Sequence, residues 1–107
     1  MSTWADYAEY SEANVRQGVE ERAGVYRMAV TGADGKYNPF YVGQSKDLRG
    51  RLLQHLSPAE TNSCIKTKLA RNRCYFRFAY MPLQVERDPE EKALIEEFDP
   101  ECNKQLT

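Results

Sequence analysis

The sequence has no run of apolar residues near the ~20 that a membrane-spanning helix needs. Residues 1–12 are polar and acidic, whereas a signal peptide requires an apolar segment. Internal repeats and low-complexity linkers are also missing. From these absences we expect a cytoplasmic protein that does not associate with membranes.

Cysteine is scarce, and Cys64, Cys74 and Cys102 form an odd set without a short paired spacing. Zinc sites and disulfide frameworks both favour closely spaced pairs such as C-x-x-C. The spacing therefore argues against a metal cluster on these residues. We expect all three to be reduced, half-buried and apolar in character.

The chain is too short for two independent cores, because its 107 residues correspond to one domain. Apolar residues make up 41% of it and charged residues 29%, a composition typical of a folded protein with one modest core. We expect a single domain over residues 1–107, with an N-terminal helical extension at 1–22 and a core at 24–105.

The net charge of −1 hides a strong segregation of charge along the chain. Residues 44–77 contain eight basic and two acidic residues, and residues 78–107 contain three basic and eight acidic ones. A basic segment suits docking of a polyanion such as DNA, although a solvated helix surface explains the charges equally well. The candidate nucleic-acid-binding residues are Lys46, Arg49, Lys66, Lys68, Arg71 and Arg73.

Periodicity, capping residues and turn signals predict the order helix, two strands, two helices, strand, helix. Three of the predicted helices cover residues 3–17, 45–56 and 88–99. The other one begins at or after residues 57–60 and ends near residue 70. The predicted strands cover 24–30, 40–43 and 74–80. Ser45 and the capping box S-P-A-E at 57–60 are the predicted helix starts. The expected fold class is α/β (α+β), a small three-stranded antiparallel sheet flanked by helices.

Two tyrosine motifs, G-V-Y at residues 24–26 and Y-V-G at residues 41–43, resemble the motifs that name the GIY-YIG endonucleases. That family carries an arginine on the following helix and a histidine or tyrosine one turn later. In this sequence Arg51 and His55 stand at those two positions. The resemblance covers residues 24–105. Within the family, the sequence is similar in these motifs to the repair endonuclease branch, which also carries G-V-Y-R-M. Gln44 departs from that branch, which has lysine after Y-V-G.

The last helix of the family bears a glutamate, followed by a proline and an asparagine, and Glu91, Pro100 and Asn103 match this order. The resemblance implies a GIY-YIG-like fold and an endonuclease that uses Mg²⁺ or Mn²⁺ to cut DNA, leaving 5′-phosphate and 3′-hydroxyl ends. It implies that Glu91 is the metal ligand. The implied catalytic residues are Tyr26, Tyr41, Arg51, His55, Glu91 and Asn103.

Arg51 and His55 are four residues apart, so they share one helix face. A guanidinium suits a phosphodiester because it is permanently charged and offers a bidentate fork to phosphate oxygens. An ion pair with the acidic C-terminal helix is the alternative for Arg51. Glu91 leads the apolar stripe of that helix, where a carboxylate suits hydrated Mg²⁺. The alternative for Glu91 is a capping box with Asp88.

Tyr26 and Tyr41 would each be interpreted alone as core or edge aromatics of a sheet. A phenol has a pKa near ~10 and becomes a base only if nearby cations lower it. His55 would assist proton transfer, or be a half-buried helix histidine. Asn103 would hold catalytic groups or a water, or satisfy backbone at a helix end.

Three classes of function stay open at this point. The first is the endonuclease, with limited intrinsic sequence specificity, because the chain has no room for an added DNA-binding region; a specificity-conferring protein subunit or a homodimer would supply what is missing. The second is a non-catalytic nucleic-acid-binding or interaction module on the same scaffold. The third is a structural domain whose acidic C-terminal part contacts a protein partner.

Overall fold

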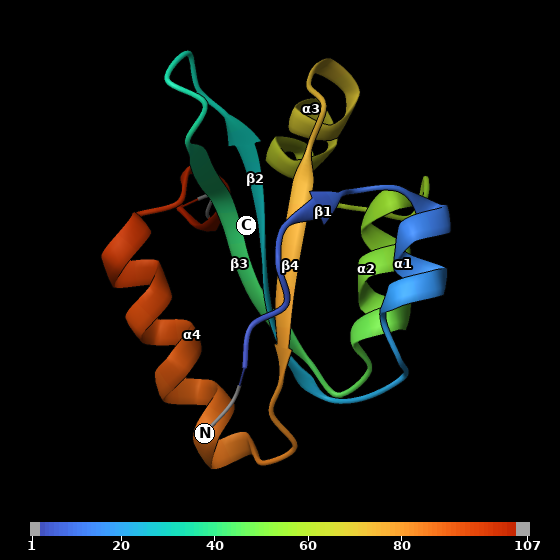
Figure 1. The fold of residues 1–107 in the computed structure, drawn as a ribbon, viewed down its shortest axis with the longest axis vertical. Helices are drawn as coiled ribbons and strands as arrows, with labels where there is room; N and C mark the ends of the chain where they lie inside the picture. The colour runs from blue at the N-terminus through green and yellow to red at the C-terminus, as the bar shows by residue number, and fades with distance from the viewer. Residues whose placement is uncertain (1–2, 105–107) are drawn as a thin grey trace.

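The computed structural model describes residues 3–104 and shows a four-stranded antiparallel sheet between two helical layers (Figure 1). The strands are β1 (Ala8–Glu9), β2 (Gly24–Thr31), β3 (Tyr37–Ser45) and β4 (Tyr75–Tyr80), in the spatial order β1-β4-β2-β3. The helices are α1 (Glu12–Gly18), α2 (Leu48–Leu56), α3 (Ser63–Arg71), α4 (Gln84–Phe98) and the 3-10 helix η1 (Glu101–Asn103). Residues 1–2 and the expected core boundary at Gln105 lie outside the described residues.

The hydrophobic core has two parts, one on each face of the sheet. Tyr26 and Met28 of β2 pack with Leu52 of α2 on one face, together with residues of α1 and α3. Val25 of β2 packs with Leu94 of α4 on the other face. The central strand is therefore buried from both sides, and β3 is left as an edge strand between the two layers.

The predicted hairpin of β2 and β3 is confirmed, with Gly35 in its turn at a φ of 78° that favours glycine. Tyr26 lies directly across from Gly43, so the two family motifs are cross-strand partners. A Cβ atom on Gly43 would stand 2.5 Å from Tyr26 Oη. The glycine of Y-V-G is thus required by the tyrosine of G-V-Y.

Gly43→Ala is expected to lower the free energy of unfolding by about 1–3 kcal/mol, because the added methyl group overpacks the ring of Tyr26. Urea denaturation measures the effect. Gly18→Ala is the matched control, because a Cβ there meets no atom within 4 Å. Equal losses in the two variants would contradict the packing explanation.

The predicted helix over residues 3–17 is wrong in its first half. Ala8 and Glu9 form β1 against β4, and the helix begins only at Glu12, after Ser11 accepts a hydrogen bond from the Asn14 N–H. Trp4 and Tyr7 pack over the guanidinium groups of Arg27 and Arg77, at 4.9–5.8 Å from ring centroid to Cζ. The aromatic residues that suggested helical spacing belong to an extended segment held by cation–π contacts.

Four further expectations are corrected. The sheet has four strands because β1 adds to its edge. Asp47, not Ser45, caps α2, and Asn62 caps α3, so residues 57–60 form no capping box. α4 starts at Gln84 rather than at Asp88 and contains Pro89.

Among residues 3–104, no helix combines the length and the apolar character needed to cross a membrane.

Candidate active site

Tyr26, Tyr41 and His55 form an aromatic cluster where β2, β3 and α2 meet. The Tyr26 hydroxyl lies 2.7 Å from His55 Nε2. The ring of Tyr41 meets His55 edge-on at 5.5 Å and lies 6.2 Å from the ring of Tyr26. Tyr26 is fully buried and Tyr41 is partly exposed. Tyr41 is therefore the tyrosine of this pair that reaches the surface.

Burial controls the protonation of this cluster. It raises the pKa of Tyr26 well above its ordinary value and raises that of Tyr41, although the nearby Arg51 guanidinium opposes both shifts. Burial and Arg51 together lower the pKa of His55. At neutral pH both phenols are therefore protonated and the imidazole is neutral.

Arg51 is partly buried on α2, and its charge acts on both tyrosines and on His55. Its Nη1 donates a hydrogen bond to Gln54 Oε1 at 2.9 Å. The alternative of an ion pair with the C-terminal helix is not realised, because the ion pairs found within residues 3–104 do not include Arg51.

Glu91 approaches the same cluster from α4, on the other side of β3. Its charge raises the pKa of Tyr41. Gln44 Nε2 donates to Glu91 Oε1 and to Asp88 Oδ1, both at 2.8 Å. The side-chain oxygen of Gln44, Oε1, accepts a hydrogen bond from Arg87 Nε at 3.2 Å, which fixes the orientation of the side-chain amide. Asp88 is not the cap of α4, so the capping-box alternative for Glu91 is ruled out.

The donor set around Glu91 fits a hydrated magnesium ion. Glu91 is partly buried, and within the described part of the chain its Oε2 receives no hydrogen bond, so one carboxylate oxygen is available. Mg²⁺ is commonly held by one or two carboxylates and keeps several waters. No group of three His, Cys, Asp or Glu side chains suited to a metal occurs in residues 3–104, so a three-ligand zinc site does not fit there.

Asn103 holds the edge strand in place. Its Oδ1 accepts from the Val42 N–H at 2.7 Å, and its Nδ2 donates to the Val42 carbonyl at 2.8 Å. The side chain thus pairs with β3 as a neighbouring strand would, one residue from Tyr41. This geometry favours a positioning role over direct contact with a water.

Sequence reasoning missed Glu60 as a residue of the site, and it missed the contacts that Gln44 makes. Glu60 is buried beside His55 Nδ1, although the S-P-A-E pattern suggested a helix cap. Its only sequence signal is a carboxylate five residues after the histidine. Gln44 was recognised as a departure from the family pattern, but its hydrogen bonds to Asp88 and Glu91 depend on how α4 packs against β3.

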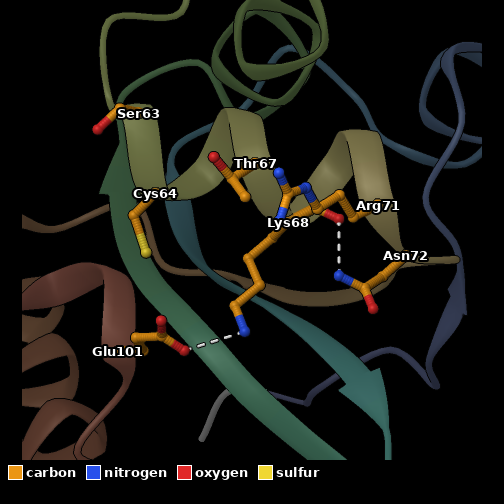
Figure 2. Close-up of a pocket in the computed structure, with 7 residues that line it drawn as sticks. All are labelled: Ser63, Cys64, Thr67, Lys68, Arg71, Asn72 and Glu101. Atoms are coloured by element: carbon orange, nitrogen blue, oxygen red, sulfur yellow. Dashed lines mark hydrogen bonds and ion pairs between the residues drawn. The ribbon is translucent and has the colours of Figure 1, made fainter.

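The predicted nucleic-acid-binding residues make different contacts in the structure. Lys68 and Arg71 line a pocket of about 530 Å³ on α3, where Lys68 pairs with Glu101 at 2.9 Å (Figure 2). Lys66 lines a separate pocket that includes His55. Arg49 Nε is bound to the Val19 carbonyl at 2.7 Å, so it faces α1. Of the two remaining basic residues, Lys46 is exposed and Arg73 lies 3.8 Å from Glu9.

The expectation of three reduced cysteines is wrong. Cys64 of α3 and Cys102 of η1 form a disulfide across 38 residues, and Cys74 is the free, buried thiol of the described chain. Sequence spacing could not show this pair, because α3 and η1 become neighbours only in the fold. The disulfide links the segment that follows Glu60 to the segment that carries Asn103.

Reduction of this disulfide is expected to lower the free energy of unfolding by roughly 2–4 kcal/mol, because the unfolded chain loses a closed loop of this length. Thermal denaturation with and without a reductant measures the change. A Cys64→Ser/Cys102→Ser variant should show the lower Tm under both conditions. A wild-type Tm that is the same with and without the reductant would contradict the presence of the disulfide.

The arrangement of strands and helices defines a mixed α/β domain with the GIY-YIG endonuclease fold, which confirms the predicted fold class apart from the number of strands. The solved structures that establish this are of the GIY-YIG N-terminal endonuclease domain of UvrC from Thermotoga maritima. A point mutant bound to its catalytic divalent cation matches with a TM-score of 0.67 and 22% identity, covering 86% of this chain and 97% of that domain.

The same domain bound to magnesium matches with a TM-score of 0.66 and 22% identity, covering 84% of this chain and 96% of that one. Another point mutant with its cation matches at 21% identity over 88% of this chain, again with a TM-score of 0.66. No family model and no curated protein sequence matches the chain.

Proposed function

We propose that the protein is a Mg²⁺- or Mn²⁺-dependent endonuclease that hydrolyses DNA phosphodiester bonds with limited intrinsic sequence specificity. The observation that carries this proposal is that Tyr41 of β3 feels the charges of both Arg51 and Glu91, while Gln44 of the same strand donates a hydrogen bond to Glu91 at 2.8 Å. Solved structures of the same fold contain a catalytic divalent cation.

Each group then has a chemical task. Arg51 binds the phosphate that is cut and neutralises the charge that builds on it. Glu91 would hold the divalent cation, which when bound would supply positive charge that stabilises the phosphodiester as it is cut. A tyrosine–histidine group, formed by Tyr26 or Tyr41 together with His55, removes the proton of the attacking water. Asn103 keeps Tyr41 in position through Val42.

The surrounding basic residues position the DNA backbone without reading bases. Sequence or structure preference would come from a protein subunit or from a homodimer. The resemblance to the repair endonuclease branch suggests a role in DNA repair, with 5′-phosphate and 3′-hydroxyl products. We place this activity in the cytoplasm. That compartment is reducing, so the Cys64–Cys102 disulfide would be exposed to reduction there.

Incubation of the protein with supercoiled plasmid tests the proposal. Nicking that requires Mg²⁺ and stops with a chelator supports the endonuclease. The alternative is a non-catalytic nucleic-acid-binding module, which would show salt-sensitive DNA binding without nicking at any metal concentration.

A further inference from the structure

Glu60 is a buried carboxylate that the proposed reaction does not yet use. It lies in the connection between α2 and α3 and is only 5% exposed, next to His55 at 2%. A buried charge is costly unless it is paired and hydrogen-bonded. Its contacts therefore indicate what the carboxylate does there.

Both oxygens of Glu60 have partners. Oε1 accepts from the Asn62 N–H at 2.8 Å, and Oε2 forms a short hydrogen bond with His55 Nδ1. Burial raises the pKa of Glu60, but the hydrogen bonds from Asn62 and His55 outweigh it and leave the pKa below its ordinary value. Glu60 is therefore ionised at neutral pH.

This ionised state determines which nitrogen of His55 carries the proton. A carboxylate only accepts hydrogen bonds, so Nδ1 must be the protonated nitrogen. The imidazole is neutral because its pKa is lowered, so Nε2 carries no proton. Nε2 then accepts the hydrogen bond from the Tyr26 hydroxyl, 2.7 Å away.

We infer that Glu60 is a positioning residue that fixes the tautomer of His55 and thereby makes Nε2 the proton acceptor of Tyr26. This inference rests on the proposed endonuclease function. The three groups form a buried relay from Glu60 through His55 to Tyr26. A carboxylate that orients a histidine in this way also stabilises the imidazolium that forms when the histidine accepts a proton.

The relay removes a difficulty with tyrosine as a base. Burial disfavours a free Tyr26 phenolate at neutral pH. When the proton of the attacking water reaches Tyr26 Oη by way of the partly exposed Tyr41, Tyr26 passes its own proton to His55 Nε2. The water oxygen forms its bond to phosphorus as the bond to the 3′ oxygen breaks. Solvent then protonates the 3′ oxygen, and the extra proton on His55 returns to solvent by the same path through the tyrosines.

Glu60→Gln separates this role from a structural one. The glutamine carbonyl can still accept from the Asn62 N–H, but its amide donates to Nδ1, which must then be unprotonated. His55 would adopt the opposite tautomer, with Nε2–H donating to Tyr26. Asn62→Ala is the control, because it removes the α3 cap and disturbs the same connection without changing the carboxylate.

Nitrogen-15 NMR reads the tautomer directly, since His55 is the chain's only histidine. The wild type and Asn62→Ala should show protonated Nδ1, and Glu60→Gln should show protonated Nε2. The pKa of His55 should fall further in Glu60→Gln, because Glu60 raises it. Protonated Nε2 in the wild type, or the same tautomer in both proteins, would overturn the inference. The titratable or charged groups around the His55 ring are Tyr26, Tyr41, Arg51, Glu60 and Lys66.

Cleavage kinetics provide the second readout. Glu60→Gln should lower kcat on plasmid DNA about 100-fold, within the range general-base catalysis contributes, and leave KM unchanged. In the wild type, kcat should fall as pH drops through the lowered pKa of His55. If the wild type cuts DNA and Glu60→Gln has the same kcat, the relay is overturned but the proposed endonuclease function is not. A wild type that does not cut overturns the proposed function, and the NMR result still decides the tautomer.

Discussion

Replacing Glu91 with alanine is expected to abolish metal-dependent DNA cleavage, with a loss of about 10³-fold or more. The cation that Glu91 would hold supplies several kcal/mol of charge stabilisation, and each ~1.4 kcal/mol corresponds to a tenfold change in rate. Glu91 is only partly buried, so the fold should survive. Single-turnover cleavage of plasmid DNA with Mg²⁺ measures the loss.

Glu97→Ala is the matched control, because Glu97 lies on the exposed side of the same helix. Its cleavage rate should equal that of the wild type, and circular dichroism should show the same helix content in all three proteins. A Glu91→Ala protein that cuts DNA as fast as the wild type would exclude Glu91 as the metal ligand.

Replacing Arg51 is expected to have the second-largest effect. Arg51→Ala should lower kcat about 10²–10³-fold, as removal of one transition-state donor does. Arg51→Lys should recover little, because an ammonium group lacks the bidentate fork of a guanidinium. The measurement is kcat at saturating Mg²⁺.

Arg16→Ala is the control for charge alone, since Arg16 is exposed and pairs with Glu12 on α1. It should keep the wild-type rate. Full activity in Arg51→Lys would show that a point charge is sufficient, and the proposed bidentate contact would then be wrong.

Local sequence signals predicted the fold well where the local and the tertiary forces agree. The hairpin of β2 and β3 is marked in the sequence by a glycine-containing turn between two strand segments, and it formed as expected. The N-terminal segment failed because Trp4 and Tyr7 are held by Arg27 and Arg77 of the sheet, a contact that no local pattern encodes. The prediction of three reduced cysteines failed for a similar reason, because Cys64 and Cys102 meet only through a tertiary contact.

The candidate site shows the same division. Spacing on one helix correctly placed Arg51 and His55 on a shared face, and the stripe on α4 placed Glu91 toward the sheet. Glu60 was assigned to a helix cap because the S-P-A-E pattern satisfies a local rule. Its burial beside His55 depends on how the connection between α2 and α3 folds back, and a one-dimensional pattern does not contain that information.

The central claim is most directly tested by the chemistry of the ends that the protein leaves on DNA. Supercoiled plasmid and branched DNA would be incubated with the protein and Mg²⁺, with a chelator, and with the chelator followed by excess Mg²⁺. The nicked product would then be treated with DNA ligase. We predict nicking only when free Mg²⁺ is present, at nicks that ligase seals because they carry 5′-phosphate and 3′-hydroxyl ends. Nicking that persists in the chelator, or no nicking under any of these conditions, would contradict the account.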